Sequence, residues 1–156
     1  MLNIGDKPEN FTLLDQDGQS TTWSDFRGRP VVVFFYPRAN TPGCTKEACG
    51  FRDLNAEFEA LGAAVIGMSA DSVRKQKNWH TKHGMTFPLL ADESQTVLAP
   101  WGVWGEKKMY GKTYEGIVRS TFLFDADGCV VRAWPKVRVT GHVEEVLEAV
   151  RDHVKA

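Results

Sequence analysis

Apolar residues occur along this chain in two patterns, as short continuous runs and at helical spacing. Residues 31–36 and 63–68 are nearly continuous apolar runs, which is typical of strands buried on both faces of a parallel sheet. Between these runs the apolar residues recur at helical spacing, starting near Thr41 and ending at Gly62. The pattern therefore predicts a strand–helix–strand unit, whose crossover should be right-handed.

Two hairpins are predicted outside this unit. Near the N-terminus, residues 10–14 and 19–23 flank an Asp/Gly turn and should form an N-terminal β-hairpin. Near the C-terminus, residues 117–124 and 129–134 flank a second Asp/Gly turn in the same way. Both hairpins are expected to extend the central sheet with antiparallel strands.

Shorter elements complete the pattern. They are one helical turn at 24–28, a helix with a basic outer face at 72–83, a strand near a sheet edge at 86–90, a short helix at 92–98 and a last helix at 140–154. Residues 101–116 show no clear period, so we expect a long irregular loop with some aromatic anchoring. The order of elements predicts an α/β fold, with a central mixed sheet flanked by helices and a thioredoxin-like arrangement as the first candidate.

Composition narrows the class of protein. A chain of 156 residues suits a single domain, which we expect to span 1–156. The 19 basic and 20 acidic residues leave a formal net charge of −1, so nothing indicates nucleic acid or a membrane as a partner. The N-terminus lacks a leader pattern and no segment reaches about 18 consecutive apolar residues, so we expect a cytoplasmic protein.

Three cysteines are too few for a secreted disulfide framework, so the close pair Cys44 and Cys49 is the first place to look for chemistry. If Thr41 is the N-cap, Pro42 takes the first helical position and Cys44 the third. The free N–H groups there and the positive end of the helix dipole favour thiolate over thiol. Because an ordinary thiol is already about 3% ionised at pH 7, full ionisation adds only about 30-fold in rate. Further acceleration must come from groups such as Thr41 and a nearby cation, which would orient the electrophile and stabilise the leaving charge.

Cys49 is five residues after Cys44. On an ideal helix it lies about 7.5 Å further along the axis and about 140° around it. A disulfide needs Cα atoms within about 7 Å, so joining the two sulfurs would require the helix to unwind. The alternative is that both are small buried hydrophobic residues, and the spacing alone does not decide between the two. A zinc site is disfavoured because the histidines form no compact pattern with the cysteines; His80 and His83 are expected to face solvent.

Arg119 is the second candidate for chemistry. Alternation along 117–124 places its guanidinium among apolar residues whichever face is inward. A buried arginine requires an anion, because a charge without a partner is costly to bury. Arg119 could instead reach solvent or a structural carboxylate from a strand end. The functional interpretation is that it holds the Cys44 thiolate and the charge that develops on an oxygen substrate.

Several segments together resemble a known family. They are Tyr36-Pro37, Thr41-Pro42-Gly43-Cys44-Thr45, Glu47-Ala48-Cys49, residues 102–111 (GVWGEKKMYG) and residues 119–122 (RSTF). Pro37, Thr41 and Cys44 stand at the spacing P-x3-T-x2-C. In these motifs the chain resembles the peroxiredoxins, specifically the bacterioferritin-comigratory or Q type, over essentially its whole length.

The resemblance implies a thioredoxin-like fold and a thiol peroxidase that acts on hydrogen peroxide and organic hydroperoxides. Cys44 would be the peroxidatic cysteine, Thr41 and Arg119 would position the peroxide and stabilise the thiolate, and Pro37 would shield the pocket. Cys49 would be the resolving cysteine of an intramolecular disulfide, which thioredoxin or a similar dithiol would reduce. No metal, flavin or haem is expected. Because the resolving pair lies within one chain, the catalytic cycle needs no partner subunit, and we expect a monomer.

Two other functions remain open. A dithiol–disulfide oxidoreductase would use the same fold, although its usual C-x-x-C motif is absent. A non-catalytic, redox-regulated chaperone is favoured only by the aromatic residues expected to be exposed in 101–116.

Overall fold

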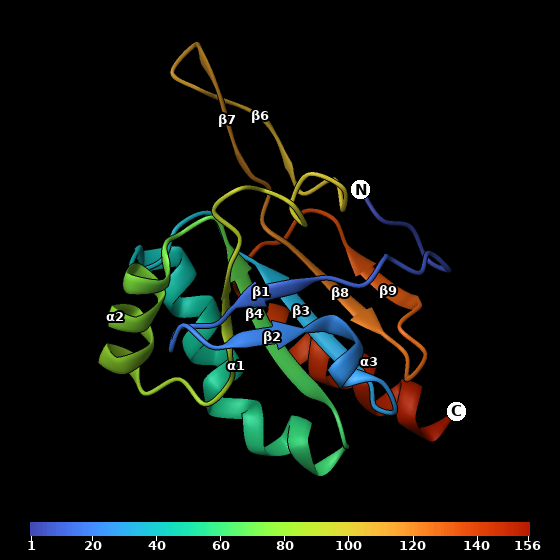
Figure 1. The fold of residues 1–156 in the computed structure, drawn as a ribbon. Coiled ribbons are helices and arrows are strands. Elements are labelled where there is room, and N and C mark those ends of the chain that lie inside the picture. The colour runs from blue at the N-terminus through green and yellow to red at the C-terminus, as the bar shows by residue number, and fades with distance from the viewer.

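A seven-stranded mixed sheet runs through the computed structural model, which describes the backbone of residues 1–156 and every side chain except that of Met109 (Figure 1). The strands are β1 (Thr12–Leu14), β2 (Ser20–Thr22), β3 (Val31–Phe35), β4 (Ala64–Ser69), β5 (Leu89–Ala91), β8 (Ser120–Phe124) and β9 (Val130–Trp134). Their order across the sheet is β2-β1-β5-β4-β3-β8-β9. β3 pairs in parallel with β4 and antiparallel with β8, so the predicted mixed sheet is confirmed.

The helices are η1 (Trp23–Phe26), α1 (Pro42–Ala60), α2 (Val73–His83) and α3 (His142–Lys155). β3 divides the core because its side chains alternate between the two faces of the sheet. Val32 and Phe34 face a cluster that includes residues of all three α-helices, and Val31, Val33 and Phe35 face a cluster built from η1 and residues 97–103. All five side chains are buried, as expected from a run without alternation.

Most predicted elements are present. Both Asp/Gly hairpins, the βαβ unit and the last helix occur where the apolar pattern placed them. α2 begins and ends as predicted, because the Ser72 side chain accepts a hydrogen bond from the Lys75 N–H and Gly84 takes a left-handed conformation (φ 57°). None of the helices in the described chain has the length and hydropathy to span a bilayer.

The loop predicted for 101–116 is wrong. Strands β6 (Trp104–Met109) and β7 (Lys112–Ile117) form a separate two-stranded sheet that projects from the body of the molecule (Figure 1). Tyr110 and Gly111 form its turn with φ values of 52° and 75°, the left-handed geometry that short hairpins favour. The hairpin shows no apolar period because most of its described side chains are exposed or polar.

The segments next to this hairpin also differ from the prediction. Residues 117–124 do not form one strand, because Ile117 ends β7 and β8 starts only at Ser120. β5 lies inside the sheet between β1 and β4, so it is no edge strand. Residues 92–98 form turns in place of a helix, since the Asp92 carboxylate accepts the N–H groups of residues 96–98 and the Thr96 hydroxyl.

His80 and His83 are half-buried, which corrects the expectation that they face solvent. The Nε2 atom of His80 lies 3.1 Å from the Phe87 carbonyl oxygen. Burial, the largest influence, lowers the pKa of His80 below its ordinary value. His80 therefore ties α2 to the segment that leads into β5.

Candidate active site

Cys44 occupies the first turn of α1, at the position predicted for it. Thr41 is the N-cap residue and Pro42 the first helical residue, so Cys44 is the third. Its side chain is only 1% exposed. The Thr41 hydroxyl does not cap the helix as predicted; it donates a 2.8 Å hydrogen bond to the Arg38 carbonyl and so closes the preceding turn. The first N–H groups of α1 consequently keep no side-chain cap, next to the sulfur.

Arg119 reaches this sulfur from the two-residue break between β7 and β8. Its Nη2 atom donates a 3.2 Å hydrogen bond to Cys44 Sγ. Its own carbonyl accepts a 2.9 Å bond from the Val137 N–H, which fixes the backbone of the break. Gly43 leaves room for this approach, because a Cβ atom there would lie 3.3 Å from Arg119 Nη2 and displace it slightly. The predicted pairing of a distant arginine with the cysteine is therefore present in the geometry.

Glu47 is the carboxyl partner of Arg119, and sequence reasoning missed its role. Arg119 Nη1 donates a 2.8 Å charge-assisted hydrogen bond to Glu47 Oε1, and the Glu47 side chain is fully buried. Burial raises the pKa of Glu47 to about 7, although the neighbouring Arg119 lowers it. Two signals could have identified it: the i+3 spacing from Cys44, which puts both on one helix face, and the need of Arg119 for a partner.

Two cations, Arg119 and Lys107, belong to the surroundings of the sulfur. Burial would lower the pKa of Arg119, but Glu47 and Cys44 together raise it above its ordinary value, so the guanidinium stays charged. Lys107 supplies a second cation; its Nζ atom donates a 2.7 Å hydrogen bond to the Ile117 carbonyl. Burial, and then the proximity of Arg119, lower the pKa of Lys107. Lys107 belongs to a segment predicted as loop, so its place at the site was not foreseen.

An open cavity of about 800 Å³ gives access to these groups. Pro37, Thr41, Cys44 and Arg119, four of the five residues predicted for the site, line it together. The remaining wall comes from the base of the β6–β7 hairpin, from the start of α2 and from the segments beside them. It carries the cations Arg38, Lys75 and Lys107, the acidic residues Asp71, Glu93 and Glu115, and the side chains of Ser72, Trp104, Tyr114 and Ile117. The cavity can therefore hold a molecule against the sulfur, between apolar side chains and charged groups of both signs.

Cys49, the fifth predicted residue, does not line this cavity. It is half-buried further along α1, which is continuously helical through both cysteines, and Cys44, Cys49 and Cys129 are all free thiols. Gly50 follows directly and lies tightly against α3, since a Cβ there would come within 2.9 Å of Val143 Cγ2. A glycine inside a helix costs about 1 kcal/mol relative to alanine. Packing against other elements therefore holds this part of α1 in its helical form.

Two tertiary hydrogen bonds secure the same segment. Trp79 Nε1 in α2 donates a 3.0 Å bond to Thr45 Oγ1, and Lys46 Nζ donates a 3.2 Å bond to Thr140 Oγ1 just before α3.

Among the described residues no three His, Cys, Asp or Glu side chains gather in a way that could hold a metal ion.

Known proteins resemble the chain along most of its length. The AhpC/TSA family model matches residues 4–133. Peroxiredoxin Bcp of Escherichia coli K12 is 43% identical over 152 residues, which cover 97% of each chain. The bacterioferritin comigratory protein of Xanthomonas campestris, studied for alkyl peroxide reduction, superposes with a TM-score of 0.88 at 42% identity over 92% of both chains. A mutant of PrxQ from Xylella fastidiosa superposes with a TM-score of 0.94 at 38% identity over 98% of both.

Proposed function

This chain belongs to the AhpC/TSA family as a peroxiredoxin of the Bcp and PrxQ type, a thiol peroxidase, and from this premise we propose which of its residues carry the reaction and how it is recycled. Peroxiredoxins use a hydroperoxide and a thiol reductant. The observation that supports the assignment of residues is the 3.2 Å hydrogen bond from Arg119 to the buried sulfur of Cys44, at the end of an open cavity.

In the proposed reaction the Cys44 thiolate attacks the terminal oxygen of a hydroperoxide. A sulfur–oxygen bond forms and the oxygen–oxygen bond breaks; with one proton taken up, the products are a Cys44 sulfenic acid and water or an alcohol. Arg119 holds the thiolate and stabilises charge on the departing oxygen, because its donors already point at the sulfur. Thr41 and Pro37 shape the entrance, where they fix the peroxide and limit access of water.

Cys49 is proposed as the resolving cysteine. Its thiol condenses with the Cys44 sulfenic acid to give a disulfide and water, and a dithiol, which we propose to be thioredoxin, reduces that disulfide. α1 must unwind locally for this step, because five helical residues separate the two sulfurs too widely. A cycle within one chain works as a monomer, and the thiol chemistry suits a reducing compartment such as the cytoplasm.

Stopped-flow oxidation of the reduced protein by several hydroperoxides, followed by mass mapping of the disulfide, tests this proposal. Cys44→Ser should abolish peroxide consumption. Cys49→Ser should react once and then fail to turn over with thioredoxin. Full steady-state turnover of Cys49→Ser, with Cys129 also replaced by serine to exclude substitution, would refute the resolving role of Cys49.

A further inference from the structure

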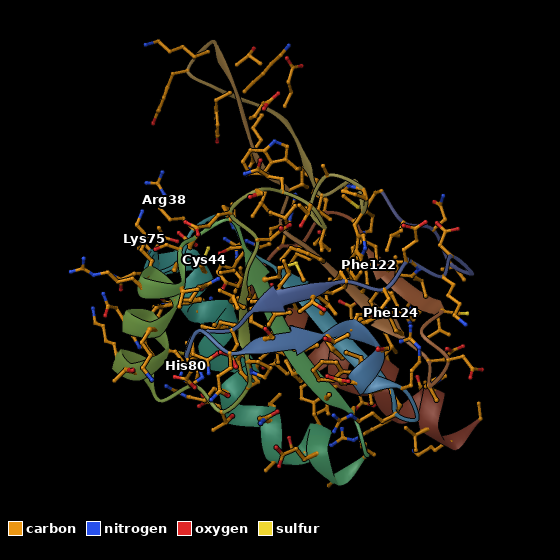
Figure 2. All side chains as sticks on the ribbon, viewed as in Figure 1. Arg38, Cys44, Lys75, His80, Phe122 and Phe124 are labelled. Atoms are coloured by element: carbon orange, nitrogen blue, oxygen red, sulfur yellow. The ribbon has the colours of Figure 1, made fainter. Side chains whose placement is uncertain are left out.

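The outer side of α2 carries cations that the peroxidase reaction does not use. Arg74, Lys75, Lys77 and Lys82 lie on this helix, which contains no acidic residue. Lys77 forms a salt bridge with Asp17. Arg38, from the loop before α1, lies beside Lys75 at the surface above Cys44 (Figure 2). Within the described side chains no salt bridge involves the four that remain, Arg38, Arg74, Lys75 and Lys82, which we call the basic face.

Three residues of the basic face, Arg38, Lys75 and Lys82, line a hollow of about 260 Å³. Its lining consists of Arg38, Ala39, Asn40, Lys75, Asn78, Trp79 and Lys82. Two of these residues, Arg38 and Lys75, also line the cavity that opens to Cys44. A carboxylate entering the hollow would thus meet three cations and two amides, next to the route to the reactive sulfur.

The hollow also adjoins the part of α1 that must unwind. Trp79, one of its lining residues, donates its hydrogen bond to Thr45, four residues before Cys49. Arg52, three residues after Cys49, donates a 2.7 Å bond to the His83 carbonyl at the end of α2. Since positions i−4 and i+3 share a helix face with position i, Cys49 lies on the side of α1 that borders α2. A disulfide formed there would be flanked by the basic face.

We propose that the basic face is the docking surface for the protein dithiol that reduces the Cys44–Cys49 disulfide, and that this partner carries acidic residues around its cysteine pair. This inference rests on the proposed function, because it requires that disulfide. The chain has a formal net charge of −1, so the unpaired cations beside the cysteines are locally concentrated and not part of a general excess. Such a patch speeds association with a partner of opposite charge. A nucleic acid would neutralise the same charges but would gain nothing from their proximity to the cysteines.

The step served by docking is a thiol–disulfide exchange. One thiolate of the partner attacks a sulfur of the Cys44–Cys49 disulfide, forming a mixed disulfide and releasing the other cysteine as a thiolate. The second thiol of the partner then attacks the mixed disulfide. The partner leaves as a disulfide, having lost two electrons, and both cysteines of this chain return to the reduced state.

The test compares two reductants on the same oxidised protein. The second-order rate constant for loss of the disulfide is measured with a reduced thioredoxin that is acidic around its cysteine pair, and with dithiothreitol, which is uncharged. The variant is Arg74→Glu/Lys82→Glu, two exposed positions outside the Cys44 cavity. The matched control is Lys136→Glu/Lys155→Glu, which changes charge equally, beyond β9 and at the end of α3.

For the α2 variant we expect the thioredoxin rate to fall by at least about tenfold, with the dithiothreitol rate and the control variant unchanged. The wild-type thioredoxin rate should fall steeply between about 0.01 M and about 0.15 M salt, where the Debye length shrinks from about 30 Å to about 8 Å.

Equal thioredoxin rates in wild type and the α2 variant would overturn the docking proposal while leaving the peroxidase intact. If the wild-type protein does not turn over peroxide with dithiothreitol as the reductant, the proposed disulfide cycle itself is refuted. The α2 variant could instead abolish binding of an oligonucleotide by the wild-type protein and leave the thioredoxin rate unaffected. This result would assign the basic face to a nucleic acid and also overturn the proposal.

Discussion

Trp79 Nε1 lies 3.0 Å from Thr45 Oγ1 and donates a hydrogen bond to the residue that follows Cys44. The indole is 1% exposed and packs against the ring of Tyr36, whose hydroxyl donates a 2.6 Å bond to Gln76 in α2. The donor is therefore fixed in a rigid part of the molecule, while the acceptor belongs to a helical segment that must unwind during the proposed cycle. This hydrogen bond stabilises the wound form.

Removing this bond should speed formation of the disulfide. Thr45→Val and Trp79→Phe each delete one partner, and a hydrogen bond contributes about 1 kcal/mol, so we expect resolution of the Cys44 sulfenic acid to accelerate about fivefold. The preceding reaction with peroxide should change little, because Arg119 and Glu47 are untouched. Two-phase stopped-flow fluorescence, with mass spectrometry of quenched samples, separates the two steps.

The double variant of Trp79 and Thr45 provides the control. If the hydrogen bond is responsible, the double variant should resolve no faster than either single variant, since both changes remove the same interaction. Strictly additive acceleration would indicate general loosening of the α1–α2 contact and contradict this role. Thr45→Val is the cleaner single change, because it leaves the packing of the indole intact.

Oxidation should melt the helix around Cys49. The spacing of the two sulfurs cannot satisfy disulfide geometry while α1 stays wound, so one molar equivalent of hydrogen peroxide should lower the helical circular dichroism signal. Cys49→Ser, which stops at the sulfenic acid, should keep its helicity and so serves as the control. Unchanged helicity in the wild type, with the Cys44–Cys49 disulfide verified by mass mapping, would contradict the prediction.

Gly43→Ala should separate stability from catalysis. Alanine is the better helix former by about 1 kcal/mol, so the variant should be as stable as wild type or more so in urea. The new Cβ would lie 3.3 Å from Arg119 Nη2 and push the guanidinium away from the sulfur by a few tenths of an ångström. We expect the rate constant for peroxide to fall by about tenfold, because a charge-assisted hydrogen bond weakens with distance. An unchanged rate would show that the position of Arg119 does not limit the reaction.

Much of the fold could be predicted from apolar spacing because burial determines it. The five residues of β3 are buried on both faces, and the αL glycine after α2 ends that helix. The β6–β7 hairpin escaped detection for the opposite reason. Tyr110 at its turn is 97% exposed, and Glu106 stands directly opposite Glu115, so no side of the hairpin shows an apolar pattern.

The site was predictable only in part. Helix-capping rules placed Cys44 in the first turn of α1, and the need of a guanidinium among apolar residues for an anion singled out Arg119. The Thr41 hydroxyl was assigned to a cap because sequence does not show that the Arg38 carbonyl is a competing acceptor. Glu47 was missed because its ion pair joins residues 72 positions apart, and spacing along one helix cannot show which distant charge will face it.

Glu47 should make the stability of the protein depend on pH. Burial raises the pKa of this carboxyl from 4.5 to about 7, so the folded protein binds a proton there more tightly than the unfolded chain does. The contribution of this carboxyl to the free energy of unfolding is therefore fully present below about pH 4.5. It falls by up to about 3 kcal/mol as the pH rises towards 7. Glu47→Gln keeps an oxygen acceptor for Arg119 but cannot ionise, so it should lack this decline.

The measurement is urea unfolding from pH 5 to about pH 8.5, with Cys44→Ser in both proteins so that only position 47 differs between them. Burial lowers the pKa of His142 to about 4, which makes stability rise with pH up to its ordinary value of 6.5. That contribution is present with and without Glu47→Gln, so the difference between the two proteins isolates Glu47. We expect the glutamine variant to gain relative stability steadily as the pH rises. If the variant loses relative stability instead, the ion pair with Arg119 outweighs burial, and Glu47 is a fully ionised partner throughout this pH range.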